Sequence, residues 1–415
     1  MPILATNTVR GEFGVPGAGV FRGGETREVS LETAAYLSTR PEFRLNYGAD
    51  DVVFRGPDGK PKYLGLFGPV SARFGYGGAS IDILQALSIL GVHVRVSPHY
   101  NGTHDTVDTV DLPPRASAQA QYRNWLPQWE LCHCLPTDMR RSRAPRKIAW
   151  TMWETDHLPQ DDLTLSGVDF GHWPNAINEH AEQVIVPCRH NAEVFRQNGI
   201  DRPITVIPYG LDTDIWPYIE RPERDSFTVV LFGDLTVRKA PFEALLAFQK
   251  AFPTEQNVRL VFKTHANHLG LTSRIPIIPD KRVTVINAMW SRAELLRLLQ
   301  HADCMLWLSR GEGFGLPVVQ ALLTGLPVVT TTHTGMAEWF RADIAEGVCT
   351  AGMSDSPLGG QWYEPDIDHA AEQLRKVYEN RKAALRKAKR GAGWLRKQFG
   401  LEAFAQRLGA FLETL

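Results

Sequence analysis

The sequence predicts an α/β protein made of two doubly wound domains, and three observations carry this prediction. The chain has 415 residues, which is more than one ordinary hydrophobic core accommodates. From Lys62 onward, apolar strand-like runs alternate with helix-like segments, as in a mostly parallel sheet that helices cover on both faces. The alternation stops at a charged, proline-containing stretch, Trp216–Asp225, and begins again at Phe227.

Residues 1–60 differ from the rest of the chain. They are rich in Gly, Arg and Glu, with one helix candidate, Leu31–Arg40, and one turn candidate, Gly56–Gly59. We interpret them as an N-terminal extension that lies outside the two doubly wound domains.

The first doubly wound domain is expected over residues 61–215. A helix candidate, Gly78–Leu90, follows its first strand, and residues 101–128 show no clear periodicity, so we interpret them as an irregular excursion. The predicted strands are Tyr63–Phe67, Val92–Val96, Leu131–Cys134, Lys147–Met152, Gln183–Val186 and Ile204–Ile207.

The second domain is expected over residues 227–395, after a linker at residues 216–226. Ser291–Glu294 has the pattern of a capping box and begins a helix that ends before Ala302. Two C-terminal helices are expected, Ile367–Arg390 and Leu401–Leu415. The predicted strands are Phe227–Phe232, Val258–Phe262, Arg282–Ile286, Cys304–Leu308 and Pro327–Thr330.

Composition and charge exclude several classes of protein. The chain is 43% hydrophobic and 22% charged, with a net charge of -1, so no global field attracts nucleic acid or an anionic membrane. No apolar run approaches the length of a membrane span, and the N-terminus has no hydrophobic signal region. Five scattered cysteines suit a reducing compartment. We therefore expect a soluble cytoplasmic protein without a transmembrane segment.

The most informative segment is Ser309–Thr330, which we interpret as a glycine-rich loop between a strand and a short helix. Pro317 suits the first turn of that helix and Gly325 its left-handed end. Free amide donors and the positive end of the helix dipole favour an anion at the N-terminus, and the carboxylate of Glu312 can hold hydroxyl groups. A place for a phosphate beside a place for several hydroxyl groups indicates a nucleotide-sugar site. The amides belong to Gly313, Phe314, Gly315 and Leu316.

This segment resembles the Glu-x7-Glu signature of retaining glycosyltransferases of family 4. The matching runs are Glu-Gly-Phe-Gly-Leu-Pro, from Glu312, and Gly-Leu-Pro-Val-Val, from Gly325. The resemblance implies the GT-B fold: two Rossmann-like domains facing a cleft, with a C-terminal helix, here residues 396–415, that crosses back to the N-terminal domain. In place of the family's second glutamate, which contacts the donor ribose, the chain has Gln320. Glutamine keeps one acceptor oxygen and adds two donors, so this contact can survive without its charge.

Arg238 and Lys239 form the second motif. They follow the first strand of the second domain and precede a helix that Pro241 opens, which places fixed positive charge beside a helix N-terminus. The segment Asp234–Lys239 resembles the branch of family 4 that has Arg-Lys at this point. That resemblance implies that both cations bind the donor diphosphate and stabilise it as it leaves. The alternative is a solvated turn with surface cations.

Two segments of the first domain complete the predicted cleft. Gly75–Ser80 fails as a dinucleotide fingerprint, but it resembles the family's first glycine loop, which implies donor contacts at Gly77 and Gly78. In Thr151–Thr155, Glu154 takes a strand-end position near the transferred sugar, where many family members have histidine. The alternative interpretation is that Glu154 belongs to an ordinary cluster of hydrogen bonds at the end of a strand. The acceptor candidates are Trp153, Asp156, His157 and His133.

Metal and cofactor requirements are expected to be absent. Cys132-His133-Cys134 lacks a second ligand pair with zinc spacing, so a buried strand is the preferred interpretation. Asp212–Asp214 looks like a metal motif but belongs to a turn that family 4 shares. Lys263 follows a strand whose end the resemblance places near the donor base. Arg238 and Lys239 would meet the phosphate charge.

The predicted reaction is transfer of a sugar from a nucleoside-diphosphate-sugar to an acceptor hydroxyl, on a glycan or small molecule, with retention. One alternative is a phage-type DNA glycosyltransferase acting on a hydroxymethylated base in the host cytoplasm, suggested by the N-terminal segment, the basic run Arg140–Lys147, and three tryptophans: Trp125, Trp129 and Trp153. Another is a non-catalytic nucleotide-sugar binding protein, suggested by Gln320 alone. The sequence does not identify the nucleotide, the sugar or the oligomeric state.

Overall fold

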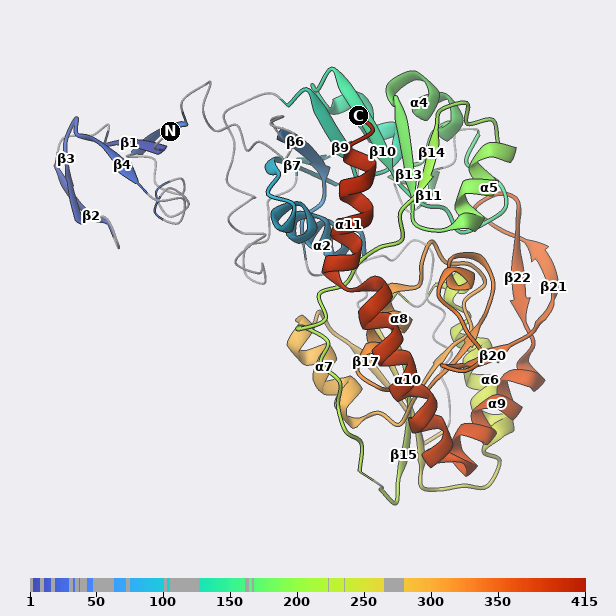
Figure 1. The fold of residues 1–415 in the computed structure, drawn as a ribbon. Coiled ribbons are helices and arrows are strands. Elements are labelled where there is room, and N and C mark those ends of the chain that lie inside the picture. The colour runs from blue at the N-terminus through green and yellow to red at the C-terminus, as the bar shows by residue number, and fades with distance from the viewer. Residues whose placement is uncertain are drawn as a thin grey trace.

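The computed structural model shows two α/β domains and a separate group of N-terminal strands (Figure 1). It describes residues 3–7, 11–15, 19–29, 33, 37, 43–47, 63–71, 75–100, 103–104, 127–160, 164–165, 168–222, 224–234, 236–264 and 280–415. Most of the predicted helix Leu31–Arg40, the turn Gly56–Gly59 and most of the excursion at 101–128, Trp125 included, lie outside the described residues; Thr33 and Leu37, which are described, are helical.

The N-terminal segment consists mainly of short strands where it is described. β1 is central in a three-stranded antiparallel sheet between β4 and β5, and β2 pairs with β3 as a hairpin. Ala5, Val15 and Phe21 are buried, which gives these strands a small core of their own. The strands are β1 (Ile3–Asn7), β2 (Glu12–Val15), β3 (Gly19–Arg22), β4 (Thr26–Val29) and β5 (Phe43–Tyr47).

A seven-stranded sheet forms the centre of the next domain. Its order is β14-β13-β10-β9-β6-β7-β8, and all neighbours are parallel except the short β8 against β7. The helix α2 (Gly75–Ile89) links β6 to β7 and starts three residues before the predicted helix. The strands are β6 (Tyr63–Gly68), β7 (His93–Tyr100), β8 (Thr103–His104), β9 (Trp129–Cys132), β10 (Arg146–Trp150), β13 (Gln183–Val186) and β14 (Ile204–Val206).

Three further helices and a small strand pair lie in the connections between the strands of this sheet. The 3-10 helix η1 fills the connection between β9 and β10, while α4 and α5 flank β13. The bounds are η1 (Pro136–Arg141), β11 (Thr164–Leu165), β12 (Val168–Asp169), α4 (Trp173–His180) and α5 (Arg189–Gln197).

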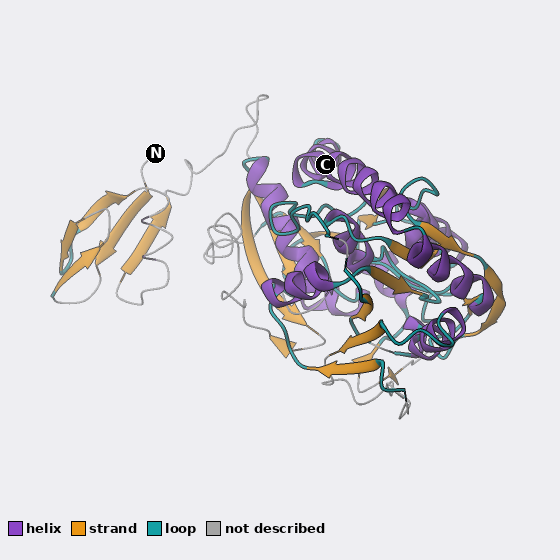
Figure 2. Ribbon diagram, turned by 90° about the horizontal axis from the view of Figure 1, so that it is seen from below, coloured by secondary structure: helices purple, strands orange, loops and turns teal. Residues whose placement is uncertain are grey.

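Six parallel strands form the second sheet, in the order β17-β16-β15-β18-β19-β20. Right-handed crossovers in opposite directions from β15 and β18 put α6 and α8 on opposite faces, and Figure 2 shows helices on both sides of the strands. The strands are β15 (Phe227–Phe232), β16 (Val258–Thr264), β17 (Val283–Asn287), β18 (Cys304–Trp307), β19 (Val328–Thr331) and β20 (Glu346–Val348). The helices are η2 (Val237–Lys239), α6 (Pro241–Ala251), α7 (Arg292–His301), α8 (Leu316–Leu323) and η3 (Thr334–Glu338).

The C-terminal segment differs from the prediction at two points. The single predicted helix Ile367–Arg390 is wrong: α9 (Ile367–Glu379) ends at Asn380, whose backbone departs from helical angles, and α10 (Arg381–Phe399) follows. In addition, an unpredicted hairpin, β21 (Thr350–Asp355) with β22 (Gln361–Pro365), precedes α9. Its glycines and polar residues hid the strand pattern.

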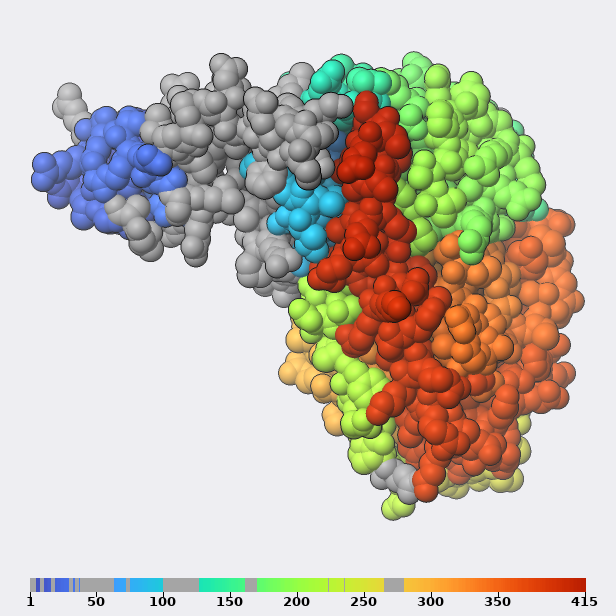
Figure 3. Space-filling model, viewed as in Figure 1, coloured from blue at the N-terminus to red at the C-terminus, as the bar shows by residue number. Residues whose placement is uncertain are grey.

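The final helices carry the chain back across both domains. α10 packs against α8, and α11 (Leu401–Leu412) packs against α2 of the N-terminal domain (Figure 3). The predicted start at residue 396 falls inside α10, because the break comes at Gly400, which bridges to Leu211. This crossing confirms the predicted two-domain fold. In the described part of the chain, no helix is long and apolar enough to cross a membrane.

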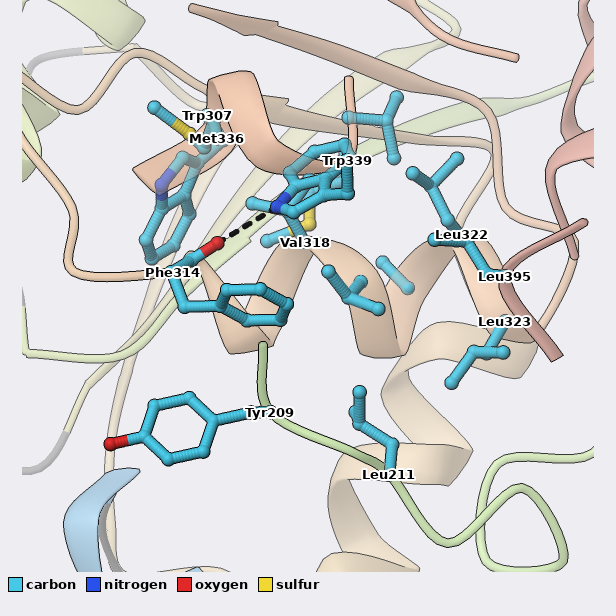
Figure 4. Close-up of a cluster of buried hydrophobic side chains, with 14 of the residues drawn as sticks. Tyr209, Leu211, Trp307, Phe314, Val318, Leu322, Leu323, Met336, Trp339 and Leu395 are labelled. Carbon is cyan, nitrogen blue, oxygen red and sulfur yellow. Dashed lines mark hydrogen bonds between the residues drawn. The ribbon is translucent and has the colours of Figure 1, made fainter. Parts of the chain in front are cut away.

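One hydrophobic core runs through both domains and holds the glycine-rich loop in place (Figure 4). The Phe314 ring contacts the Tyr209 ring edge-on, with centroids 5.8 Å apart. The backbone carbonyl of Phe314 accepts a 2.8 Å hydrogen bond from Trp339 Nε1. Because Tyr209 belongs to the first domain and Trp339 to the second, the loop is fixed where the domains meet.

Candidate active site

The predicted site residues lie at the carboxyl ends of three parallel strands. The loop after β15 carries Arg238 and Lys239, and the loop after β18 carries Glu312. The segment after β10 of the other domain carries Glu154. Open parallel sheets bind ligands at this edge, so the fold alone brings these charges together.

Four charged side chains form one cluster between the domains. Lys239 Nζ lies 2.5 Å from Glu312 Oε1, and Arg238 Nη1 lies 3.4 Å from Glu312 Oε2. Arg238 Nη2 lies 3.4 Å from Glu154 Oε1, so one guanidinium joins carboxylates from both domains. Trp307 Nε1 also donates to Glu312 Oε1, at 3.2 Å.

Burial and neighbouring charge oppose each other in this cluster. Burial favours the neutral acid of Glu312, but Lys239 and Arg238 outweigh it and hold its pKa below the ordinary value. Burial and the adjacent Arg238 lower the pKa of Lys239. For Arg238, burial is outweighed by Glu154 and Glu312, which raise its pKa. Two carboxylates therefore hold Arg238 and Lys239 in position and balance their positive charges.

The glycine-rich loop ends at an uncapped helix. Gly315 precedes α8 with φ of 82°, no side chain caps the first turn, and Pro317 stands within it. A Cβ on Gly313 would come within 2.2 Å of Met152 Sδ, and one on Gly335 within 2.4 Å of the Gly313 carbonyl oxygen. Glycine is thus required for close approach. Val318 N and Val319 N donate to Gly315 O, and Pro317 has no N–H, so in the first turn of α8 an anion would meet the amide of Leu316.

Residues that the sequence analysis missed hold this loop. Thr334 Oγ1 accepts a 3.0 Å hydrogen bond from Glu312 N, and Gly335 N donates to Glu312 O at 2.8 Å. Arg310 is buried, and its backbone N donates to Arg238 O at 2.8 Å. The available signal was Arg310 itself, a cation two residues before Glu312 in the glycine-rich motif.

A cavity of about 210 Å³ opens beside the charged cluster. Both domains line it, which places Glu154 and the predicted acceptor candidate Trp153 at its wall. A Cβ on Gly311 would lie 2.0 Å from the Glu154 carbonyl oxygen, so the domains touch at this point. The lining residues are Tyr76, Leu135, Met152, Trp153, Glu154, Phe170, Trp173, Asp234, Thr236, Val237, Arg238, Pro357, Leu358 and Trp362.

His133 lies inside the first domain rather than at the cavity. Its side chain is fully buried, Nδ1 is 2.7 Å from Ser80 Oγ, and Nε2 is 2.8 Å from Tyr209 Oη. Burial lowers the pKa of this imidazole to about 3. With both ring nitrogens engaged, His133 connects α2 to the core and offers no nitrogen to an acceptor.

The other acceptor candidates support the cavity wall. Asp156 Oδ1 accepts a 2.6 Å hydrogen bond from Gln361 N, across the domain boundary. The His157 carbonyl accepts from Trp153 Nε1 at 2.7 Å, which fixes the indole. Trp153 therefore faces the cavity while Asp156 and His157 hold neighbouring chain in position.

The remaining donor-binding candidates lie around the loop ends. A Cβ on Gly77 would meet Ser71 O at 2.4 Å, so this glycine serves the turn, whereas a Cβ on Gly78 would lie 3.5 Å from Arg292 Nη2 of the second domain. Lys263 is the last residue but one of β16, with its ammonium 5.3 Å from the centroid of the Trp290 ring, and it is not part of the cavity lining. Gln320 and Leu316 are partly exposed on α8.

The residues considered as metal ligands have other contacts. Cys132 and Cys134 are buried, and Asp212 Oδ1 accepts a 3.0 Å hydrogen bond from Asp214 N within the turn. Within the described ranges, no group of three or more His, Cys, Asp or Glu residues is placed to hold a metal ion.

Comparison with known proteins identifies a family. A family model described as family 4 glycosyltransferase in conflict systems matches residues 189–408. A protein of Acidianus filamentous virus 2 described as a glycosyltransferase is 25% identical over 211 residues, which are 48% of this chain and 58% of that protein. Glycogen synthase of Mycobacterium tuberculosis is 27% identical over 204 residues, 49% of this chain and 46% of that enzyme. The chain thus spans about half the length of these relatives.

Solved structures share the fold. Sucrose-phosphate synthase from Thermosynechococcus elongatus has a TM-score of 0.63 at 15% identity, covering 85% of this chain and 98% of that one. The Anabaena protein HepE, solved in complex with UDP-glucose, has a TM-score of 0.59 at 15% identity, covering 85% and 100%. At this identity the likeness shows the fold alone, and it confirms the predicted GT-B architecture.

Proposed function

The chain belongs to the family 4 glycosyltransferases in conflict systems, and on that premise we propose that it transfers a sugar from a nucleoside-diphosphate-sugar to an acceptor hydroxyl with retention of configuration. The observation that carries the proposal is the buried cluster of Arg238, Lys239 and Glu312 beside the uncapped start of α8. Fixed cations and a free amide in one place suit a diphosphate.

Each part of this cluster has a role in holding the donor. Arg238 and Lys239 bind the diphosphate, together with the amide of Leu316 at the start of α8. Glu312 keeps both cations in position and offers its carboxylate to hydroxyls of the transferred sugar. A uridine diphosphate sugar is the first donor to test, because HepE binds UDP-glucose in the same fold.

The proposed reaction is a front-face displacement. The acceptor oxygen bonds to the anomeric carbon on the side from which the diphosphate leaves, and the hydroxyl proton passes to a phosphate oxygen. The bond from the anomeric carbon to the diphosphate breaks, and Arg238 and Lys239 stabilise the negative charge that develops. Glu154 and Glu312 are both paired with Arg238, which disfavours either as a covalent nucleophile. The cations meet the phosphate charge, so we propose that no metal is required.

Released nucleoside diphosphate tests this proposal across UDP-, GDP- and ADP-sugars. We expect one donor class to be turned over, and Arg238→Ala to lose about 100-fold or more of the rate. Lys250→Ala is the matched control, because Lys250 is an exposed cation at the far end of α6 that pairs with exposed Asp368. Equal turnover by wild type and Arg238→Ala would contradict the proposal, and an inverted product would contradict retention.

Tight donor binding without any turnover would instead support a non-catalytic nucleotide-sugar binding protein. The observation behind this second candidate is Gln320, a neutral amide where family 4 has a glutamate.

A further inference from the structure

Arg238 presents one side of its guanidinium to its own domain and the other side to the cavity. On the inner side, Nη1 donates to the backbone oxygen of Gly311 at 2.5 Å and lies 3.4 Å from Glu312 Oε2. On the outer side, Nη2 lies 3.4 Å from Glu154 Oε1, and both Arg238 and Glu154 line the cavity. The inference below concerns this outer side, and it rests on the proposed transferase function.

The other cation of the cluster is held within the second domain. Lys239 Nζ lies 2.5 Å from Glu312 Oε1 and 4.9 Å from the centroid of the Trp307 ring, and its side chain is only 10% exposed. Trp307 Nε1 donates to the same carboxylate oxygen at 3.2 Å. Lys239 therefore contributes its charge from behind this pair, whereas Nη2 of Arg238 is the nitrogen that faces a ligand.

Glu154 stands where a phosphate oxygen would have to bind. An anion that accepts a hydrogen bond from Arg238 Nη2 needs the place that Glu154 Oε1 now takes, and two anions at one nitrogen repel each other. The two cations of the cluster are already balanced by two carboxylates, so a diphosphate brings surplus negative charge. One carboxylate has to move away when the donor binds.

Of the two carboxylates, Glu154 is the one that is free to move. Glu312 is 7% exposed, is bound by Lys239 and Trp307, and has its backbone N fixed by Thr334 Oγ1 at 3.0 Å. Glu154 is 20% exposed, and in the described part of the chain its side chain makes a single ion pair. It stands at the wall of a cavity of about 210 Å³, which has room for another rotamer.

The backbone at Glu154 is fixed, so the movement is confined to the side chain. Asn191 Nδ2 donates to the carbonyl oxygen of the preceding residue, Trp153, at 2.7 Å. A Cβ on Gly311 would lie 2.0 Å from the carbonyl oxygen of Glu154 itself, so the second domain touches the backbone here. A change of side-chain rotamer is enough to separate the Glu154 carboxylate from Arg238.

We propose that Glu154 occupies the phosphate-binding side of Arg238 in the donor-free protein, and that the donor diphosphate displaces its carboxylate into the cavity. The Glu154–Arg238 pair then lowers donor affinity, because the pair must separate before the diphosphate binds. Partly exposed ion pairs contribute little, so the loss of donor affinity is about 3- to 10-fold. Glu154 thus acts in the opposite sense to a residue that binds the donor.

The direction of the effect in Glu154→Gln tests this proposal. The substitution keeps the size of the side chain and removes its charge. UDP, GDP and ADP are titrated calorimetrically into wild type and the variant, and thermal unfolding confirms that both are folded. We expect the nucleotide that wild type binds to bind Glu154→Gln about 3- to 10-fold more tightly.

Two further variants separate displacement from other effects of lost charge. Asp234 lines the same cavity, but among the described residues it forms no ion pair with Arg238, so Asp234→Asn should tighten binding less than about 2-fold. Glu338 pairs with Arg189 across the two domains at 3.3 Å and is not part of the cavity lining. Glu338→Gln therefore removes an interdomain ion pair elsewhere, and it should leave the Kd unchanged.

The outcomes separate this inference from the proposed function. If no nucleotide binds folded wild type, the proposed function fails. If a nucleotide binds wild type and binds Glu154→Gln equally or more weakly, the displacement is wrong while the donor site stands. The displacement is also wrong if Asp234→Asn or Glu338→Gln gains as much affinity as Glu154→Gln.

Discussion

Gln320 lies on the partly exposed face of α8, one turn after the proposed phosphate-binding amide of Leu316. A neutral amide makes weaker hydrogen bonds to ribose hydroxyls than a carboxylate does. We expect Gln320→Glu to lower the donor KM about 3- to 10-fold with little change in kcat, and Gln320→Ala to raise it. Steady-state kinetics with the preferred donor measure both. If the three proteins share one donor KM, the side chain does not contact the donor.

His133 makes stability depend on pH. Burial lowers its pKa from 6.5 in the unfolded chain to about 3, so the folded state excludes the proton. The stabilising contribution is therefore complete above pH 6.5 and is lost as pH falls from 6.5 toward 3. Between pH 6.5 and 5, wild type should lose about 2 kcal/mol more unfolding free energy than His133→Gln. Urea unfolding across this pH range tests it, and parallel curves would contradict it.

At the scale of single residues, the sequence predicted which charged side chains share a site better than it predicted which polar side chains are buried. Arg238, Lys239 and Glu312 were expected at one donor site because of the resemblance to family 4, and they meet at the carboxyl ends of β15 and β18. His133 was expected near the acceptor because it matches a family position near the cleft, and the sequence did not reveal its buried partner Tyr209, which is 76 residues away.

The hairpin β21–β22 supplies part of the cavity wall through Leu358 and Trp362, and Arg310 holds the hairpin in place. Arg310 Nη2 lies 2.6 Å from Glu243 Oε1 and 2.8 Å from Glu364 Oε2, with its side chain 8% exposed. Removing one member of a buried ion pair leaves uncompensated charge, so Arg310→Ala should destabilise the protein by about 3 kcal/mol or more.

Arg341→Ala is the control for that prediction. Arg341 pairs with Asp343 at 2.9 Å, but both side chains are about half exposed, so its loss should change stability by about 1 kcal/mol or less. Urea unfolding compares the two variants. Equal effects would show that Arg310 does not hold the hairpin.

Strands and helices with a clear hydrophobic pattern were predictable from the sequence, whereas the hairpin β21–β22 was not. The apolar runs at β15 and β18 are buried strands, except for the partly exposed Thr228, and each has a neighbouring strand on both sides, so their apolar pattern is continuous. β21 is exposed along nearly all of its length and contains Gly352 and polar residues. The helix break at Asn380 was missed because both flanking segments are amphipathic and helix-forming.

At the scale of the whole molecule, glycines allow the two domains to meet. A Cβ on Gly311 would be 2.0 Å from the Glu154 backbone oxygen, which a rotamer change cannot relieve. Gly311→Ala should therefore hold the domains apart and reduce transferase activity at least 10-fold, since Glu154 and Arg238 would separate. Small-angle X-ray scattering should show a larger radius of gyration for the variant.

Gly393→Ala is the matched control for domain closure. Gly393 lies on α10, and a Cβ there would meet nothing within 4 Å among the described residues. Its radius of gyration and activity should equal those of wild type. If Gly311→Ala also matched wild type in both measurements, contact at this point would not be needed for the reaction.

The central claim is that Arg238 and Lys239 bind the diphosphate of a sugar donor, and calorimetric titration tests it most directly. UDP, GDP and ADP are titrated into wild type, Arg238→Ala and the control Lys250→Ala. We predict that one nucleotide binds wild type and the control equally, and binds Arg238→Ala at least about 30-fold more weakly, because a buried charged contact is lost. Equal affinity for wild type and Arg238→Ala, or no binding of any nucleotide to folded wild type, would contradict the account.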